Sequence, residues 1–153
     1  MLDDIDRRLL AELQADASVS LEKLGERVGL SRNACWNRVR RLEEAGILKA
    51  RVALVDPEKV NLGLCVFIAV RTSEHDPAWL ETFARETRAI AEIQGVYRTS
   101  GDLDYLIRAR VPDVAAYDAL YQRLIRRVRL ADVSASFVME EIKETTALPL
   151  NYA

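Results

Sequence analysis

The densest group of residues able to do chemistry lies between Arg27 and Leu42, a stretch with five arginines, two asparagines and no acid. In the major groove of DNA, an asparagine amide can pair with adenine and an arginine with guanine. Neighbouring arginines neutralise phosphates. The stretch therefore favours contact with DNA, and a solvated amphipathic helix is the simpler alternative.

One face of this stretch gathers the side chains that can recognise bases. If Cys35, Val39 and Leu42 (spacing i, i+4, i+7) point into a core, Asn33 and Asn37 lie on the opposite face of the same helix. Asparagine is a mediocre helix former, so helix stability alone does not explain two of them on an exposed face. We predict that the helix contacts DNA through Ser31, Arg32, Asn33, Trp36, Asn37, Arg40 and Arg41.

The residues of this helix are expected to take different roles. Ser31 and Arg32 lie at its N-terminus, where phosphate contacts are more common than base contacts. Trp36 either packs against a neighbouring helix or lies over the edge of a sugar-phosphate backbone.

Two further residues of the helix are expected to face the protein. Arg38 points back toward the other helices, where Glu26 or Glu12 can pair with it. Cys35 is expected to be a small apolar core contact. A redox-sensing thiol is the alternative for this cysteine.

A second group of polar residues lies within Arg98–Tyr105. Asp102 and Asp104 project to the same side of an extended chain, next to hydroxyl groups. Such a group can hold the ammonium of a small zwitterion, while backbone amides hold its carboxylate. Ser134 and Ser136 share one face of a later strand and can form part of the wall. The alternative is an ordinary hairpin, since glycine and aspartate are common turn formers.

The chain lacks the residues that most catalytic and metal sites need. It has one histidine, His75, and no glycine-rich phosphate loop, nucleophile elbow or histidine-based catalytic set. Two cysteines, Cys35 and Cys65, are too few for a disulfide scaffold or a zinc site. We predict no enzyme activity, no cofactor and no metal, with Cys65 and His75 in structural roles. A small-molecule enzyme in the second half of the chain is the rival interpretation.

Three short helices must position the first group, and they account for residues 1–48. Ser20 precedes the second helix, and Gly29 suits the left-handed position that ends it. Ser31 caps the third helix, which Gly46 stops. A glycine turn before a polar third helix is typical of a helix-turn-helix unit, and the wider domain is expected to be winged-helix-like.

A change of period follows the helices. Leu48, Val52 and Leu54 share a face that excludes the basic residues between them, which predicts a strand over 48–54. A connector then leads to the second domain, so residues 49–63 are interpreted as strand and connector.

The remaining residues, 64–153, are interpreted as a β-α-β-β-α-β domain. The predicted strands cover 64–71, 95–100, 103–111 and 132–142, with helices that begin at Pro77 and after Asp113. This order is the ferredoxin-like arrangement, with two helices on one face of an antiparallel sheet, and gives the chain an α+β fold. The other face of the sheet also needs cover, so a second copy of the chain is expected to supply it as a homodimer.

The average composition hides the local charge. The 153 residues hold 22 basic and 24 acidic side chains, a net charge of −2 with a pI near 5.5. A nucleic-acid-binding protein usually has an excess of basic residues. The average charge therefore argues against nucleic-acid binding, whereas the acid-free stretch between Arg27 and Leu42 argues for it. No apolar run approaches the roughly 20 residues that span a bilayer, and Met1–Asp16 is charged rather than signal-like. We expect a soluble, cytoplasmic protein.

Several short motifs, spread over essentially the whole chain, are typical of one family. They are Leu2–Leu10, Val28–Ser31, Arg38–Leu48, Ser100–Tyr105, Val138–Lys143 and Leu148-Pro149. On these motifs the chain resembles the Lrp/AsnC (feast/famine) transcription regulators of bacteria and archaea. The resemblance implies an N-terminal helix-turn-helix domain and a C-terminal ligand-sensing domain that pairs through its sheet, often with four dimers in an octamer.

The resemblance also implies an effector, usually an amino acid, bound between C-terminal domains near residues 100–104. The effector site is expected to comprise Arg98, Thr99, Ser100, Gly101, Asp102, Asp104, Ser134 and Ser136. Arg98 and Ser136 are more polar than the residues expected in a leucine sensor, and the segments Cys35-Trp36 and Ser136–Glu140 are similar to the branch associated with cysteine sensing. We predict a sequence-specific transcriptional regulator of amino-acid metabolism that binds double-stranded DNA. The alternative is an architectural DNA-binding protein without an effector.

Overall fold

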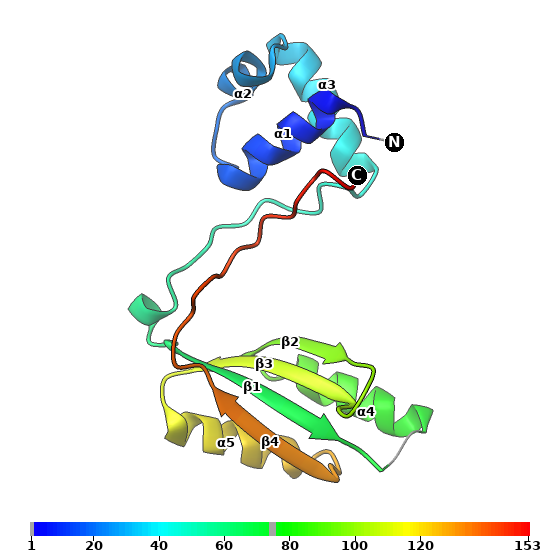
Figure 1. Cartoon of the computed structure of the whole chain (residues 1–153), viewed down its shortest axis with the longest axis vertical. Helices are drawn as coiled ribbons and strands as arrows, with labels where there is room; N and C mark the ends of the chain where they lie inside the picture. The colour runs from blue at the N-terminus through cyan, green and yellow to red at the C-terminus, as the bar shows by residue number, and fades with distance from the viewer. Residues whose placement is uncertain (1, 74–75) are drawn as a thin grey trace. The chain divides into compact units, whose positions relative to one another are not determined.

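The computed structural model describes residues 2–73 and 76–153, so the expectation for His75 lies outside the described residues. The chain forms two compact units. Residues up to Leu54 and Lys143–Ala153 make the first unit, and Val55–Ile142 make the second. Figure 1 shows helices α1–α3 in the first unit and a sheet with α4 and α5 in the second.

The first unit is built from α1 (Asp4–Ala15), α2 (Leu21–Val28) and α3 (Arg32–Glu44). Asp3 begins α1 with a capping box, in which it and Asp6 accept each other's backbone amide. Ser20 and Ser31 cap α2 and α3 through their hydroxyls, and Gly29 ends α2 with a φ of 76°. These caps confirm the predicted helix-turn-helix unit.

Helix α2 approaches the following turn closely at Gly25. A Cβ added there would lie 2.6 Å from the carbonyl oxygen of Leu30, whose amide donates to the carbonyl of Gly25 at 2.8 Å. Residue spacing does not single out this glycine, because the contact joins backbone atoms on both sides of the turn. The core beneath the turn contains Leu9, Leu13, Leu24, Val28, Cys35 and Val39.

The strand predicted over 48–54 is wrong. These residues form no regular element, and the side chains of Val52 and Leu54 are 71% and 74% exposed. The alternation is present, but a strand also needs a neighbour for its backbone groups, and no strand of the described chain pairs with it. The connector continues through the 3-10 turn η1 (Glu58–Val60).

The C-terminal segment Lys143–Ala153 joins the helical unit, whereas its place in the sequence predicts that it belongs to the second domain. The amide of Leu148 donates to Gln14 Oε1 at 2.7 Å, and Gln14 Nε2 donates to the carbonyl of Leu148 at 3.1 Å. Arg7 Nε donates to the carbonyl of Ala153 at 2.9 Å. The difference arises because periodicity does not show which unit an extended segment joins.

The second unit has the predicted ferredoxin-like topology. Its elements are β1 (Leu64–Arg71), α4 (Pro77–Arg88), β2 (Ile93–Arg98), β3 (Tyr105–Val111), α5 (Val114–Ile125) and β4 (Asp132–Phe137). The strands form one antiparallel sheet in the order β2-β3-β1-β4. This arrangement confirms the α+β fold class.

Three strands have ends that differ from those predicted. β2 begins at Ile93 and stops at Arg98, with an irregular register between Ile93 and Gly95. β3 begins only at Tyr105, so the residues between the two strands form a loop. β4 stops at Phe137 instead of continuing to residue 142, although the amide of the next residue still donates to β1.

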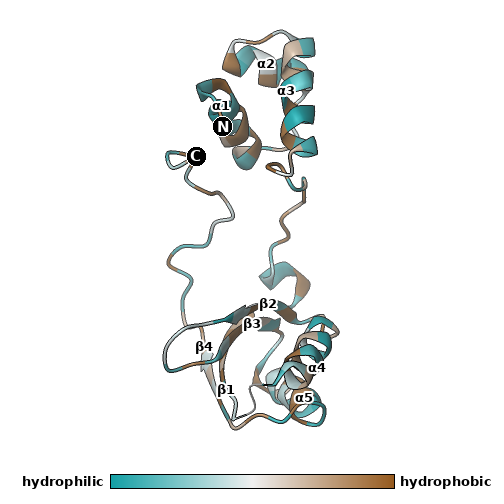
Figure 2. Ribbon diagram, turned by 90° about the vertical axis from the view of Figure 1, so that its right-hand side faces the viewer, coloured by the Kyte–Doolittle hydropathy of each residue, from teal (hydrophilic) through white to brown (hydrophobic). Residues whose placement is uncertain are grey.

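The two faces of the sheet have different surroundings. Figure 2 shows α4 and α5 on the same side of the sheet, which leaves the other side without a helix of the described chain. Val66, Ile68 and Val70 are buried in the core beneath the helices. On the opposite face, which we call the open face, Phe67 is 36% exposed and Ser136 pairs beside it.

Candidate DNA interface and ligand-binding loop

Helix α3 presents one buried and one exposed face, as its spacing predicts. Cys35, Val39 and Leu42 are each at most 3% exposed. The residues predicted to contact DNA are all exposed: Ser31, Arg32, Asn33, Trp36, Asn37, Arg40 and Arg41. The structure therefore brings all seven to one accessible helix.

Three of these side chains have no partner among the described residues. The amides of Asn33 and Asn37 make no side-chain hydrogen bond, and Arg32 makes no ion pair, within residues 2–73 and 76–153. Ser31 accepts the amide of Ala34 with its hydroxyl at 3.3 Å and so begins the helix. The unpartnered amide groups are free to meet a ligand without first breaking an internal contact.

Arg40 is held along the helix surface. Its Nε donates to Glu44 Oε1 at 2.7 Å, and its guanidinium carbon lies 5.4 Å from the centre of the Trp36 ring. Trp36 is 47% exposed, so it packs beneath an arginine of its own helix instead of in the core. An exposed pair of this kind contributes little to stability, so Arg40 can leave Glu44 at small cost.

Arg38 and Arg41 are anchored on α1. Arg38 Nη1 donates to Asp3 Oδ2 at 2.6 Å and to Asp6 Oδ1 at 2.9 Å, while Arg41 Nη2 donates to Asp6 Oδ2 at 2.6 Å. The expectation that Arg38 points toward the protein is confirmed, but the predicted partners Glu26 or Glu12 are wrong. The acids that pair with these arginines belong to the capping box of α1. Residue spacing around α3 does not predict this pairing.

Glu12 has another partner, and the pairing alters the charge of the whole stretch. Glu12 Oε2 accepts from Arg27 Nη1 at 2.8 Å. Four of the five arginines therefore face an acid, and Arg32 is the exception among the described residues. The basic surface is weaker than the sequence alone indicates.

The geometry also shifts two pKa values in this cluster. The hydrogen bond from Arg38 lowers the pKa of the Asp3 carboxyl, and the amide of Asp6 lowers it further. The same contact with Asp3 raises the pKa of Arg38. Both groups are charged at neutral pH and hold α3 against α1.

Cys35 has the environment of a structural thiol. Its side chain is fully buried, and desolvation raises its pKa above the ordinary value. A reactive cysteine needs an accessible thiolate. The burial supports the apolar role over the redox alternative.

The second predicted site is a loop tied to the end of β1. Thr99 Oγ1 donates to the carbonyl of Leu103 at 2.6 Å, and the amide of Asp104 donates to the carbonyl of Val70 at 3.1 Å. Asp104 Oδ2 accepts the amide of Thr72 at 2.9 Å. The carboxylate of Asp104 therefore fixes the loop, which we call the 99–104 loop.

The tip of the loop remains available to a ligand. Asp102 is exposed, and its carbonyl accepts Arg71 Nε at 2.8 Å, which leaves the carboxylate outside that contact. Gly101 has a φ of 110°, a conformation that favours glycine, and no atom of the described residues lies within 4 Å of the place a Cβ would take. The loop can thus present backbone groups and one carboxylate together.

A single chain does not bring the eight predicted effector residues together. Arg98 pairs with Tyr105, which packs in the core under the helices, so Arg98 lies on the helix-covered side. Ser134 and Ser136 pair with Ala69 and Phe67 and lie on the open face. The pairing of Arg98 with Tyr105 decides on which side Arg98 emerges.

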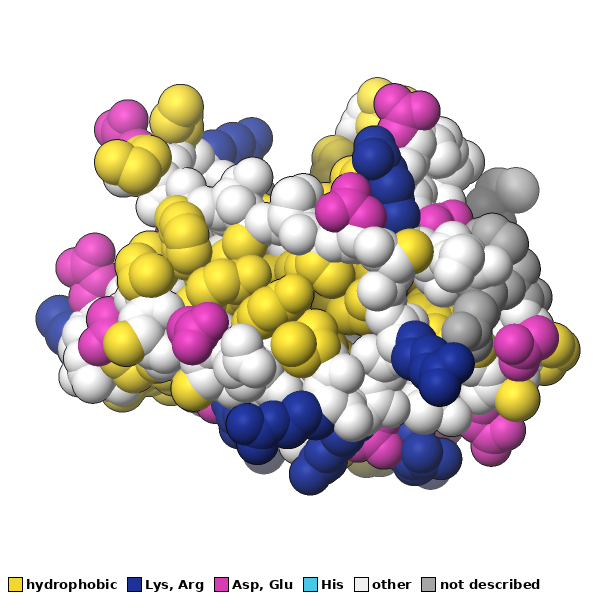
Figure 3. Space-filling view, turned by 90° about the horizontal axis from the view of Figure 1, so that it is seen from below, with side chains coloured by type: hydrophobic (Ala, Val, Ile, Leu, Met, Phe, Trp, Pro, Cys, Tyr) yellow, Lys and Arg dark blue, Asp and Glu magenta, His cyan; other side chains and the backbone are white. Residues whose placement is uncertain are grey.

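Hydrophobic side chains also gather on the side of the second unit formed by α5 and β4. Figure 3 looks from below at the elements drawn lowest in Figure 1, and hydrophobic atoms form a continuous patch there. Among the partly buried residues of α5 and β4, Tyr117, Val133 and Phe137 pack against the core of the second unit, and the rings of Tyr117 and Phe137 meet edge to face at 5.3 Å.

Two kinds of feature are absent from the part of the chain that the structure describes. No helix there is long and apolar enough to cross a membrane. No group of three or more histidine, cysteine or acidic side chains in residues 2–73 and 76–153 is arranged to hold a metal ion.

Both halves of the chain match known domains. Residues 2–43 match the AsnC-type helix-turn-helix domain, and residues 65–148 match the Lrp/AsnC ligand binding domain. The DNA-binding transcriptional activator DecR of Escherichia coli is 47% identical over 151 residues, which are 98% of this chain and 99% of that protein.

Solved structures agree over the whole length. An AsnC family transcriptional regulator from Agrobacterium tumefaciens is 46% identical, with a TM-score of 0.96 and 99% of both chains covered. A transcriptional regulator from Neisseria meningitidis, solved as a complex with L-methionine, is 37% identical, with a TM-score of 0.94 and the same coverage.

A helix-turn-helix unit joined to an α+β ligand-binding unit defines a DNA-binding transcriptional regulator. The two domain matches span most of the chain. The chain belongs to the Lrp/AsnC family.

Proposed function

We propose that this regulator reads operator DNA with the exposed face of α3. The observation that carries the proposal is the pair of amides at Asn33 and Asn37, unpartnered within the described chain, on a helix with no acid before Glu43. Each amide has the geometry to pair with adenine in the major groove. Arg32 and Ser31 lie at the N-terminus of the helix, where they meet phosphates.

Arg40 and Arg41 are proposed as contacts that change partner on binding. Arg40 leaves Glu44 and contacts a base edge or a phosphate. The ring of Trp36 keeps the Arg40 side chain extended along the helix. Arg41 reaches a phosphate with the part of its guanidinium that Asp6 leaves free, since its side chain is 59% exposed. These residues complete the proposed DNA-binding set.

We further propose a homodimer formed through the open face of the sheet. Phe67 is 36% exposed in the middle strand of this face, and Tyr97 is 50% exposed at the edge strand. A second copy supplies the cover that no helix of the described chain provides. Two recognition helices then meet half-sites roughly 34–36 Å apart on DNA, and the family resemblance supports association of four such dimers.

The effector is proposed to be a small amino acid held at the 99–104 loop. The relative from Neisseria meningitidis, solved with L-methionine, supports this class of ligand. Asp102 is assigned to the ammonium group, with the backbone amides of Ser100 and Gly101 for the carboxylate, while Asp104 holds the loop in place. Ser134 and Ser136 contribute where the open faces of two copies meet.

The ligand controls DNA binding through assembly. It favours one arrangement of dimers over another and so changes which half-sites are occupied together. It can shift this equilibrium only by its differential affinity for the two arrangements. The family supports a regulatory role without enzyme activity.

Fluorescence anisotropy with the upstream region of the protein's own gene tests the DNA-binding proposal. Failure to bind any duplex at low salt contradicts it. Calorimetry against the twenty amino acids tests the effector, with cysteine and methionine first. Heat with none of them contradicts an amino-acid effector and favours the architectural alternative.

A further inference from the structure

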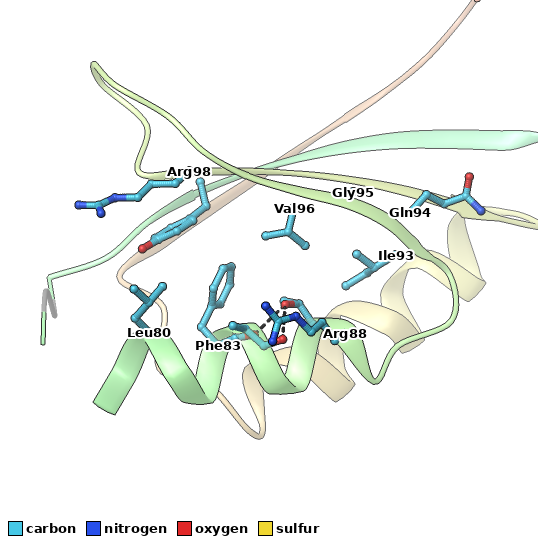
Figure 4. Close-up of a pocket in the computed structure, with 11 residues that line it drawn as sticks. Leu80, Phe83, Arg88, Ile93, Gln94, Gly95, Val96 and Arg98 are labelled. Carbon is cyan, nitrogen blue, oxygen red and sulfur yellow. Dashed lines mark hydrogen bonds between the residues drawn. The ribbon is translucent and has the colours of Figure 1, made fainter. Parts of the chain in front are cut away.

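An apolar pocket of 390 Å³ lies between the edge strand β2 and helix α4. Its volume is within the range of about 300–1,000 Å³ that is usual for small-molecule sites. Figure 4 shows Leu80 and Phe83 rising from α4 toward Val96 and Ile93 of β2, so that both elements line the same space. This pocket is on the helix-covered side of the sheet, away from the open face.

Two arginines on the wall of this pocket have no counter-ion in the described chain. Arg88, at the end of α4, and Arg98, at the end of β2, make no ion pair with any described residue. Arg85 on the same helix, by contrast, donates to Glu86 at 3.1 Å. The pocket thus concentrates positive charge that the described residues do not neutralise.

Tyr105 adds a hydroxyl without a partner in residues 2–73 and 76–153. The residue is 7% exposed, its ring lies 4.7 Å from that of Phe83, and its hydroxyl makes no hydrogen bond with the described chain. The hydroxyl oxygen is not among the buried atoms of the described chain that lack a partner, so it is accessible at the pocket and can donate to a ligand. Tyr105 lines the same pocket as the two arginines.

The chemistry of the wall selects the ligand. None of the described residues that line the pocket is an acid, so no carboxylate there can form an ion pair with an ammonium group. We propose that the α4–β2 pocket binds a small molecule with an apolar tail and one carboxylate, and without an ammonium group. The carboxylate accepts from Arg88, with the Tyr105 hydroxyl as a further donor, and the tail lies against Phe83 and the apolar side chains around it. Figure 4 shows Arg98 extending away from this space, so Arg98 adds positive charge at the rim of the pocket.

The ligand class separates this pocket from the proposed effector site. A protein carboxylate is the strongest partner for the ammonium of an amino acid, and the 99–104 loop offers Asp102. The lining of the α4–β2 pocket has no equivalent group among the described residues. Branched or unbranched short fatty acids and 2-oxo acids share the required chemistry.

Isothermal titration calorimetry with the full chain tests the proposal with 4-methylpentanoate. The neutral probe 4-methylpentanamide has the same tail, and it should bind about tenfold more weakly, as expected when a charged hydrogen bond is lost. Equal affinity for the acid and the amide overturns the proposal. So does the absence of binding by 4-methylpentanoate at millimolar concentration.

Three variants locate the binding. Arg88→Gln should weaken the binding of 4-methylpentanoate about tenfold. Tyr105→Phe should weaken this binding several-fold without lowering the melting temperature, since the hydroxyl has no described partner to lose. Arg126→Gln removes a positive charge from the exposed end of α5, outside the pocket, and should change the affinity less than twofold. An equal effect of Arg88→Gln and Arg126→Gln overturns the assignment.

L-Leucine separates this proposal from the effector proposal. If L-leucine still releases or absorbs heat with the Arg88→Gln and Tyr105→Phe variants, it binds at the effector site. This result supports the selectivity of the pocket. Heat that both variants abolish shows a pocket that accepts an ammonium group and overturns the stated ligand class. Failure with 4-methylpentanoate, together with an intact amino-acid response, overturns this inference alone and leaves the effector proposal standing.

Discussion

The carboxylate of Asp6 lies 2.6 Å from the guanidinium of Arg41, and only 1% of the Asp6 side chain is exposed. Its other oxygen accepts from Arg38 at 2.9 Å, so one buried acid of α1 holds two arginines of α3. A buried charge is tolerated when partners of opposite charge surround it. The contact fixes α3 against α1 and at the same time neutralises part of the surface proposed to face DNA.

Replacing Asp6 should therefore strengthen non-specific DNA binding. In Asp6→Asn, Arg41 loses its counter-ion and Arg38 keeps only Asp3. The salt dependence of binding to a random duplex should therefore become steeper by about 0.9 for each additional phosphate contact. Discrimination between operator and random DNA should fall. Anisotropy titrations at several salt concentrations measure both quantities.

Asp4→Asn is the matched control for that experiment. Asp4 lies on the same helix with its side chain 95% exposed and pairs only with Arg7 among the described residues. Its replacement should leave the salt dependence close to that of the wild type. An unchanged slope in Asp6→Asn, with the helical unit still folded by circular dichroism, contradicts the masking of Arg38 and Arg41.

The two classes of DNA contact should give different mutant signatures. Asn37→Ala should cost about 1–3 kcal/mol on the operator and relax the preference at one base pair. Arg32→Ala should weaken binding to all DNA sequences alike and reduce the slope of log affinity against log salt concentration by about 0.9. A uniform loss in Asn37→Ala would assign this residue to the backbone of DNA instead of to a base.

The close approach at Gly25 should make α2 intolerant of a methyl group. Gly25→Ala forces its Cβ to within 2.6 Å of the carbonyl oxygen of Leu30, so the backbone must move. The helical unit should lose about 1–3 kcal/mol of unfolding free energy, as in other overpacked sites. Gly63→Ala, whose Cβ meets only ordinary contacts at 3.5 Å, is the control in urea unfolding.

The pairing of Asp3 with Arg38 should make stability depend on pH in the acid range. The pKa of Asp3 is lowered in the folded chain, so its contribution is present above the ordinary value of 3.8 and is lost as the pH falls through the lower folded pKa. Asp3→Asn should thus destabilise the protein at pH 7 and much less at pH 3. Urea unfolding at the two values measures the difference, and an equal loss at both would contradict the ion pair.

Local spacing was sufficient to predict the face that α3 presents. Cys35, Val39 and Leu42 recur at the helical period. When these three are buried, Asn33 and Asn37 lie on the exposed face, regardless of the rest of the fold. The serine caps and Gly29 likewise act over a few residues, so the helix-turn-helix unit and its boundaries could be predicted from neighbours in the sequence. The order of strands and helices predicted the ferredoxin-like sheet for the same reason.

Contacts between distant residues leave no mark in the local pattern. Asp6 meets Arg38 and Arg41 across 32 and 35 positions of the chain, and no periodic pattern links them. Residues 48–54 alternate as a strand does, yet no described strand pairs with them. Arg98 and Ser134 were predicted to share a site between C-terminal domains. Within one chain, Arg98 pairs with Tyr105 and lies on the helix-covered side, whereas Ser134 pairs with Ala69 on the open face.

The sequence by itself determined the helices, their amphipathic faces and the order of the sheet strands in the second unit, because helix caps and periodicity depend on near neighbours. The tertiary structure alone decided which of the residues predicted to bind DNA are free. Folding brings the acids of α1 onto the arginines of α3 and leaves Asn33, Asn37 and Arg32 without partners in the described chain. Electrostatic contacts and strand register join residues far apart in the chain, and only the folded arrangement sets their distances.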